Sequence, residues 1–345
     1  MSTIKVGAIN SKTGNSALTV ADDGTVTTST DFALPSGTTA QRPSSPVTGS
    51  MRYNTDLGYV EYYDGDAAAW LGMSASGSLY ASGGTITEIT QGGTDYIVHT
   101  FSTVGTHTFN VLRGSGEVEY LVVAGGGEGE SDGGNGANAA GGGAGGYRCS
   151  VSGETSGGNS SAESPYAISV GDSITVTVGA GGTKPFVAFS AGENGEDSSF
   201  GTIVSTGGQG GNKGSTDQGG SGGGAGAYQS TNFGIGIDGQ GSDGGSGAVN
   251  LESGGGGGAG ADAVNRDAGD GLYSSITGTS VARGGGGAGH RWGVAAGTPG
   301  AGGGGSWPGG AGTANTGGGG GGGYTYGPQQ GGAGGSGIVI VRYAV

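Results

Sequence analysis

Glycine is distributed unevenly along this chain, and that distribution limits what the chain can fold into. Of the 93 glycines, 16 lie in residues 1–123 and 77 lie in residues 124–345. Glycine loses more conformational freedom on folding than any other residue, so a glycine-rich region needs an unusual source of stabilisation. The boundary falls within the sequence EYLVVAGGG, and a strand-like run at 338–341 follows the last glycines.

Three kinds of structure use so much glycine. Collagen requires glycine at every third position and abundant proline, but runs such as 253–262 break that period and the chain has only 8 prolines. A flexible linker is the simplest alternative. However, segments 195–211 and 271–287 share a Ser-Ser, aromatic and Ile pattern, which is typical of a degenerate internal repeat. The third structure is a stack of extended threefold polyglycine II helices, bonded main chain to main chain.

We expect the third structure, because only glycine, with an occasional Ala or Ser at the edge, lets such helices approach closely enough. The runs expected to form the stack are 141–146, 207–211, 219–226, 254–260, 284–289, 301–305, 317–323 and 331–336. The apolar run at 117–123 and the strand at 337–343 match in character. We expect these two strands to lie side by side in one sheet and to close the glycine region as a single module.

The sequence before the glycine region is of ordinary β type. Strands are expected near 85–90, 95–101, 106–112 and 117–123, with turn residues between them. Four parts result: an attachment or oligomerisation segment (1–33), a β meander (34–79), a β-sheet domain (80–124) and a polyglycine II domain (125–345). The predicted fold class is all-β, combining thin N-terminal segments, a meander, a β-sandwich-like module and a polyglycine II stack without significant α-helix.

Charge and cysteine content exclude several functions. The net charge is −15 with only 12 Lys and Arg, whereas a protein that binds nucleic acid or an anionic membrane needs a basic surface. No apolar run approaches the roughly 20 residues that span a bilayer. The opening MSTIKVGAIN lacks the features of a Sec signal, so we expect synthesis in a cytoplasm. Cys149 is the single cysteine, so no internal disulfide is possible.

No group of residues predicts catalysis, a cofactor or a metal. The pattern GxGxxG recurs through composition alone, without the helix that a dinucleotide site needs. The three histidines are too scattered for a zinc site with Cys149. His99 and His107 flank a predicted hairpin, where pairing on the surface is favoured over metal ligation. Acidic residues within 192–200 and 236–245 do not match an EF-hand loop. We therefore expect a non-enzymatic protein.

Aromatic residues between the late glycine runs are the best candidates for a binding site. Exposed aromatic rings beside an arginine can bind sugars or protein receptors by stacking and hydrogen bonding. The alternative for each ring is that it packs along the flank of the glycine stack. The receptor-binding candidates are His290, Arg291, Trp292, Trp307, Tyr324 and Tyr326.

Two parts of the chain resemble known families. Residues 34–73, LPSGTTAQRPSSPVTGSMRYNTDLGYVEYYDGDAAAWLGM, resemble a module of bacteriophage tail fibres that reads leucine-proline, QRP, G, RYN, a strand and a tryptophan. The opening MSTIKVGAI resembles the start of marine phage structural proteins. Residues 117–345 resemble the glycine-rich domains of marine phage and bacterial surface proteins, and are similar in architecture to the polyglycine sandwich adhesins of T-even-type phages.

The resemblance implies a virion protein, a tail fibre or adhesin whose loops between glycine helices bind a host cell-surface glycan or protein. The N-terminal segment would join other virion proteins. Its few large apolar residues cannot form a core alone, so we expect a homotrimer. A capsid (head) fibre or decoration protein is the alternative within this class. From another class, a cellular extracellular adhesive, or an ice- or matrix-binding fibre protein, remains open.

Overall fold

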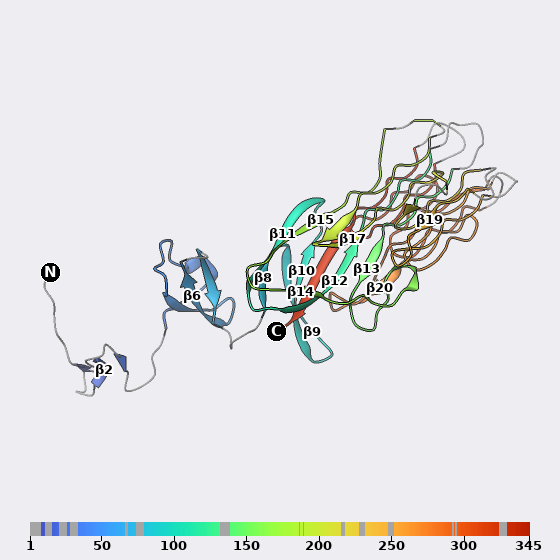
Figure 1. Ribbon diagram of the computed structural model, residues 1–345. Coiled ribbons are helices and arrows are strands. Elements are labelled where there is room, and N and C mark those ends of the chain that lie inside the picture. The colour runs from blue at the N-terminus through green and yellow to red at the C-terminus, as the bar shows by residue number, and fades with distance from the viewer. Residues whose placement is uncertain are drawn as a thin grey trace. The chain divides into compact units, whose positions relative to one another are not determined.

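The chain forms two compact units, residues 1–77 and 78–345. The structure is a computed structural model (Figure 1). Before residue 34 it gives only the backbone of three short antiparallel strands: β1 (Ala8–Asn10), β2 (Ser16–Val20) and β3 (Val26–Thr27). The remaining described residues are 34–65, 68–73, 79–131, 139–185, 187–188, 190–214, 218–227, 232–247, 252–291, 293, 295–323 and 330–345.

The first unit contains the predicted meander with one additional strand. The four-stranded sheet has the order β4 (Ser36–Gly37), β5 (Met51–Asn54), β6 (Tyr59–Asp64) and β7 (Ala69–Gly72). Strands β5, β6 and β7 pair antiparallel, and β4 adds in parallel. The single turn of 3-10 helix η1 (Thr39–Gln41) lies between β4 and β5.

The second unit begins with two antiparallel sheets that face each other. The first sheet has the order β13 (Tyr147–Cys149), β12 (Gly116–Val123), β22 (Ile338–Ala344), β10 (Thr94–Phe101) and β9 (Thr85–Gln91), with β14 (Tyr166–Ile168) beside β12. The second has the order β17 (Ile203–Ser205), β16 (Ser198–Phe200), β15 (Ser173–Val178), β11 (Gly105–Arg113) and β8 (Tyr80–Ser82).

The predicted pairing of the two apolar strands is confirmed. Strands β12 and β22 are antiparallel neighbours, with Glu119 opposite Arg342 and Val123 opposite Ile338. Alternate residues of these strands enter two different apolar clusters, because successive side chains of a strand point to opposite faces. One cluster fills the space between the two sheets and includes Phe109 and Phe200. The other covers the opposite face of the first sheet.

That second cluster joins the sheet to later parts of the chain. Leu121 and Ile340 pack there with Leu272, from the hairpin of β20 (Leu272–Ser274) and β21 (Val281–Arg283), and with Ala259, from a glycine run. The first sheet is therefore covered on both faces, which explains why β12 and β22 read as continuous apolar runs. A further short parallel pair, β18 (Gln218–Gly219) and β19 (Ile235–Gly236), lies among the glycine runs.

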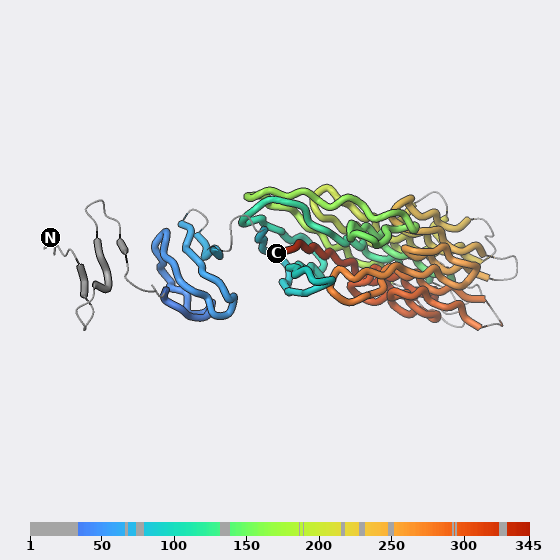
Figure 2. The backbone as a smooth tube through the Cα atoms, turned by 90° about the horizontal axis from the view of Figure 1, so that it is seen from below, coloured from blue at the N-terminus to red at the C-terminus, as the bar shows by residue number. Residues whose placement is uncertain are grey.

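The glycine runs continue from these strands and lie side by side (Figure 2). In the run 124–131, the backbone N–H groups bond to three neighbouring runs in rotation, at N···O distances of 2.8–3.0 Å. The donor–acceptor pairs are 124–146, 127–143 and 130–140; 125–196, 128–193 and 131–190; and 126–335 and 129–332. The partner repeats at every third residue, which is the signature of a threefold helix.

The carbonyl groups of the same run bond to three other segments. Gly125 and Glu128 accept hydrogen bonds from residues 208 and 211, Gly127 and Glu130 accept from 320 and 323, and Gly126 accepts from 182. The run is thus surrounded by six segments, which bond all of its N–H groups and five of its carbonyl groups without a hydrogen bond inside the run. The predicted polyglycine II stack is therefore present.

Close approach of the backbones explains the need for glycine. A Cβ atom built on Gly256 would lie 1.9 Å from the carbonyl oxygen of Gly142, and one on Gly127 would lie 2.1 Å from that of Gln209. Both distances are far inside van der Waals contact, and the obstructing atoms are backbone. A side chain at these positions would force the runs apart and break their hydrogen bonds.

One predicted run is wrong, and further real ones were not predicted. Gly302 and Gly303 have φ of +99° and lie in a turn, whereas a polyglycine II helix has φ near −75°, so 301–305 is not a continuous member of the stack. Runs 124–131 and 190–197 are members, although they contain glutamates. A search for uninterrupted glycine misses them, because a side chain is tolerated wherever it points out of the close contacts.

Candidate functional site

Three of the predicted binding residues, His290, Arg291 and Trp307, lie at the distal end of the stack, meaning the end of the glycine runs away from the two sheets. Ala124, directly after β12, bonds to residue 146, whereas Glu130 bonds to Ala140, six residues further out. The backbone N–H of Ser253 donates to the carbonyl of His290, and its Oγ donates to that of Ala139. His290 therefore lies in the distal layer.

Trp307 lies in the same layer and stacks on His290. The indole Nε1 donates to the carbonyl of Gly323 at 3.1 Å, and Gly323 donates in turn to the carbonyl of Glu130. The indole and imidazole rings have centroids 3.9 Å apart and planes 7° from parallel. The sequence reasoning proposed both residues for one site, and the structure brings them into direct contact. Trp292, Tyr324 and Tyr326 lie outside the described residues.

His290 is buried and Trp307 is half-buried, so one face of the indole is covered by the imidazole rather than open to solvent. Burial, followed by the charge of Arg266, lowers the pKa of His290 below its ordinary value. The imidazole is therefore neutral at pH 7. His290 therefore packs against the glycine stack, which was the alternative to a binding role. Trp307 keeps part of its surface exposed.

Arg291 supplies the accessible charge beside this stack. Its side chain is 36% exposed, and its Nη1 lies 3.9 Å from a carboxylate oxygen of Glu252. Glu252 is buried and is held more closely by Arg266, whose Nη1 lies 3.1 Å from the other carboxylate oxygen. The long contact to Glu252 leaves Arg291 able to turn toward a ligand, because an exposed ion pair of this kind contributes little stability.

Sequence reasoning missed Glu252 and Arg266. They lie 41 or more positions before Trp307 and in different segments from His290. No local motif connects them, since the stack brings them together through backbone hydrogen bonds. The distal site thus consists of a neutral histidine stacked on a tryptophan, beside two arginines that share one buried carboxylate.

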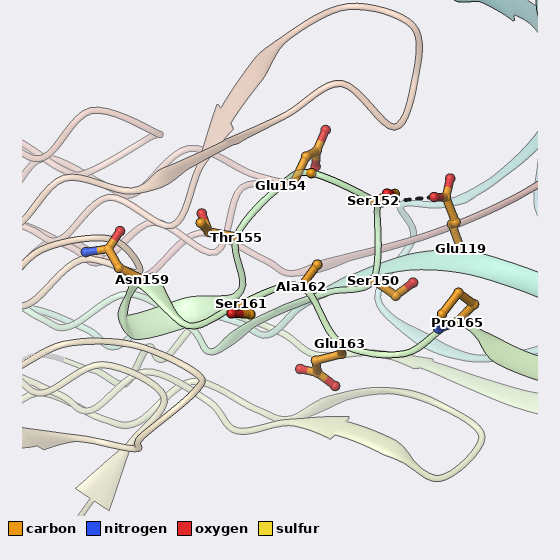
Figure 3. A pocket seen from close by; sticks show the side chains of 11 residues that line it. Glu119, Ser150, Ser152, Glu154, Thr155, Asn159, Ser161, Ala162, Glu163 and Pro165 are labelled. Carbon is orange, nitrogen blue, oxygen red and sulfur yellow. Dashed lines mark hydrogen bonds between the residues drawn. The ribbon is translucent and has the colours of Figure 1, made fainter.

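A second candidate is a polar groove beside the first sheet, with a volume of about 600 Å³ (Figure 3). Glu119 of β12 and Pro165 lie on one side of it, and the loop around 150–163 forms the rest. The lining residues are Glu119, Ser150, Ser152, Gly153, Glu154, Thr155, Asn159, Ser161, Ala162, Glu163 and Pro165. Three carboxylates and several hydroxyl groups resemble the polar lining of a small-molecule site.

Each carboxylate of this groove already has structural partners. Glu119 accepts from Arg342 Nε at 2.7 Å and from the backbone N–H of Ser152 at 3.0 Å. Glu154 accepts from both the N–H and the hydroxyl of Ser275 at 2.8 Å. These bonds tie the loop to the first sheet and to the β20–β21 hairpin. These structural bonds explain why the groove is lined with carboxylates.

Glu163 is the most strongly held of the three. Arg148 donates to both of its oxygens, at 2.8 and 2.6 Å, and Tyr120 donates at 2.8 Å. Burial raises the pKa of Glu163, but the bonds from Arg148 and Tyr120 outweigh burial and hold the pKa below its ordinary value. Glu163 therefore stays ionised near neutral pH, unlike a general acid, which needs a raised pKa.

Among the residues that the structure describes, no three His, Cys, Asp or Glu side chains are arranged to hold a metal ion. In the same part of the chain, no helix has the length and apolar character needed to cross a membrane.

A family model described as a glycine-rich domain matches residues 101–344, which include the glycine stack and the strands of the two sheets other than β8, β9 and most of β10. No curated protein matches the chain.

Proposed function

The chain belongs to the glycine-rich domain family, and from that premise we propose that it is a non-enzymatic structural protein of a phage virion. Its role would be that of a tail fibre or receptor-binding adhesin, with the distal end of the glycine stack directed at the host surface. The N-terminal segment, residues 1–33, would join other virion proteins, and the protein would be a homotrimer. Assembly would take place in the host cytoplasm.

The observation that carries this proposal is the placement of the distal site on a rigid support. The runs beneath His290, Arg291 and Trp307 are bonded laterally along their length, and at the other end they continue into strands of a packed sandwich. Binding residues held on a rigid scaffold lose little entropy when a partner binds. A flexible glycine linker would provide no such support.

The chemistry of the distal site favours a neutral or acidic partner rich in hydroxyl groups. Arg291 presents guanidinium donors, and the indole of Trp307 offers partly exposed aromatic surface. Arginine and aromatic surface together are suited to sugar hydroxyls, carboxylates and protein side chains. We therefore propose a host cell-surface glycan, or a protein receptor, as the partner.

Binding of the intact protein to host cells tests this function. Replacing Arg291 with Ala should weaken binding roughly tenfold, as expected when a charge-assisted hydrogen bond worth about 1.5 kcal/mol is lost. Trp307→Ala should weaken it at least as much, and thermal unfolding must show that the stack survives. Tyr273→Ala is the matched control, because Tyr273 is 61% exposed on β20, outside the distal site. Unchanged binding in both distal variants would refute the proposed site.

Electron microscopy of labelled particles tests the location. Antibody bound at the tail fibres is the expected result. Label on the capsid would instead support the role of a head fibre or decoration protein. Absence of the protein from particles would reject the virion role and revive an extracellular adhesive.

A further inference from the structure

One arginine of the second unit is directed into an apolar cluster. Arg283 lies on β21 opposite Leu272 of β20, and Leu272 packs in the second apolar cluster with Tyr147 of β13. Residues that face each other across an antiparallel pair lie on the same side of the sheet. The side chain of Arg283 therefore points toward the same cluster, and only 7% of the residue is exposed.

The guanidinium group of Arg283 has an unsatisfied donor. Its Nη1 is buried and has no hydrogen-bond partner among the residues that the structure describes. None of the ion pairs in that part of the chain includes Arg283. A guanidinium stays protonated in proteins. Burying such a charge is costly unless a counter-charge and hydrogen bonds compensate for it.

A second unsatisfied group, the hydroxyl of Tyr147, lies in the same place. It is fully buried and also lacks a hydrogen-bond partner in the described part of the chain. Ser274 lies beside it but outside hydrogen-bonding geometry, and the Oγ of Ser274 accepts the N–H of Ile276 at 3.2 Å. Burial raises the pKa of Tyr147 and lowers that of Arg283, and each group also acts on the pKa of the other through its charge. The phenol and the guanidinium are therefore neighbours.

The carboxylate of Glu154 also acts on Arg283, but other groups hold it. Its Oε1 accepts from the N–H and the hydroxyl of Ser275 at 2.8 Å, and its Oε2 accepts from Cys149 Sγ at 3.4 Å. Glu154 follows burial and Tyr147 in its influence on the pKa of Arg283. It therefore compensates the charge of Arg283 only from a distance, and no oxygen of the described residues accepts from Nη1.

We propose that Arg283 and Tyr147 bind a small monovalent anion, a halide such as chloride. Both groups can donate a hydrogen bond, and a halide accepts from both without having to donate one in return. A water molecule also accepts hydrogen bonds, but it leaves the buried charge without a counter-ion. The neighbouring side chains of the cluster are buried, which favours a monatomic anion over a larger one.

This position gives the anion a structural role. The second apolar cluster is formed by the first sheet, the β20–β21 hairpin and the glycine run that contributes Ala259. An anion bound there stabilises the junction between the sandwich and the base of the glycine stack. The site is separate from the distal site, and the inference does not depend on the proposed function.

The first experiment measures thermal unfolding of the intact chain in sodium chloride and in sodium gluconate of equal ionic strength. Gluconate is too large for the enclosed site. The Tm should be higher in chloride by about 3 °C or more once chloride exceeds its Kd about tenfold, because a ligand that binds only the folded state stabilises it. Equal Tm values in the two salts would overturn the proposal.

Variants assign the chloride effect to the site. Arg283→Met should abolish it and should still fold, because an apolar side chain in place of a buried charge is often neutral or stabilising. Tyr147→Phe should need about tenfold more chloride, since one hydrogen bond to a charged group is lost. Arg113→Met is the matched control, because Arg113 ends β11 in the second sheet, and it should respond like the wild type. An effect that persists in Arg283→Met would overturn the proposal.

A second experiment locates the anion directly and needs no variant. Crystals of the intact protein are soaked in sodium bromide, and anomalous scattering is measured at the bromine edge. A peak in contact with both Arg283 Nη1 and the Tyr147 hydroxyl is the expected result. A water molecule or the Glu154 carboxylate at that position would contradict the proposal. A peak without chloride-dependent stability would indicate an adventitious ion only and would equally contradict it.

Discussion

The sandwich and the glycine stack are parts of one compact unit, yet different physical forces hold them. Apolar side chains such as Phe109 and Phe200, with ring centroids 5.6 Å apart, fill the space between the two sheets. In the stack the interior is backbone, and hydrogen bonds between neighbouring runs replace side-chain contacts. The chain passes from one regime to the other at residue 124 without an intervening loop.

The difference determines which changes each region tolerates. An apolar core accepts another side chain of similar volume at modest cost, because the interaction is not directional. The stack offers no such freedom, since the space beside an interior glycine is already occupied by a backbone oxygen. Substitutions of similar size should therefore be tolerated in the sandwich and should destabilise the stack.

The largest effect is expected at Gly256. A Cβ there would meet the carbonyl of Gly142 at 1.9 Å, so Gly256→Ala should destabilise the second unit by more than about 4 kcal/mol. For a unit of this size that corresponds to a fall in Tm of roughly 10 °C or more. Gly116→Ala is the control, because nothing lies within 4 Å of a Cβ at Gly116. Similar Tm values for the two variants would show that the runs are loosely packed.

A smaller effect is expected in the sandwich. Phe109→Ala should cost about 3–5 kcal/mol, measured by denaturant unfolding, because it leaves a cavity beside Phe200 and His99. Phe109→Leu should recover most of this stability, since an apolar core accommodates a change of shape. If Phe109→Leu were as damaging as Gly256→Ala, the contrast between the two regions would be lost.

The smallest expected effect is a dependence of stability on pH, which arises from one buried histidine in each region. Burial lowers the pKa of His99 in the sandwich, and burial followed by Arg266 lowers that of His290 in the stack. The unfolded chain binds more protons than the folded chain once the pH falls below the ordinary value near 6.5, so stability should decrease on acidification through this range. Above it, neither histidine should contribute a pH dependence.

Phenylalanine variants assign this dependence to the two regions. His99→Phe and His290→Phe should each flatten the plot of unfolding free energy against pH between 7 and 5. The neutral ring of His99 also accepts a hydrogen bond at Nε2 from the hydroxyl of Tyr343. Its Nδ1 donates a hydrogen bond to the carbonyl of Gly83. An unchanged slope in the His99 variant would show that this ring is accessible to protons in the folded state.

Much of the architecture could be predicted from the sequence because it rests on periodicity and steric exclusion. Strands β9, β10, β11 and β12, the pairing of β12 with β22 and most of the glycine runs follow from apolar patterns and from the rule that only glycine fits close backbone contacts. The turn at Gly302 and Gly303 could not be foreseen, since glycine adopts positive φ as readily as negative φ.

The candidate site was less predictable, because long-range contacts decide burial. His99 was expected on the surface of a hairpin, but it is fully buried since strand β22 and residues 81–83 close over it. His290 likewise reads as an exposed loop residue and is buried under Trp307. The partners Glu252 and Arg266 are brought to the distal layer by hydrogen bonds of the glycine runs, which leave no trace in local sequence.

The position of β22 has a consequence for the order of folding. Arg342 bonds to Glu119 across 223 residues of chain, and β22 lies between β12 and β10. In topological terms, the whole glycine stack is one connection between two adjacent strands. Closing so long a loop is slow, and until it closes β10 and β12 lack the strand that joins them. We therefore expect folding of the sandwich and ordering of the glycine runs to be coupled and late.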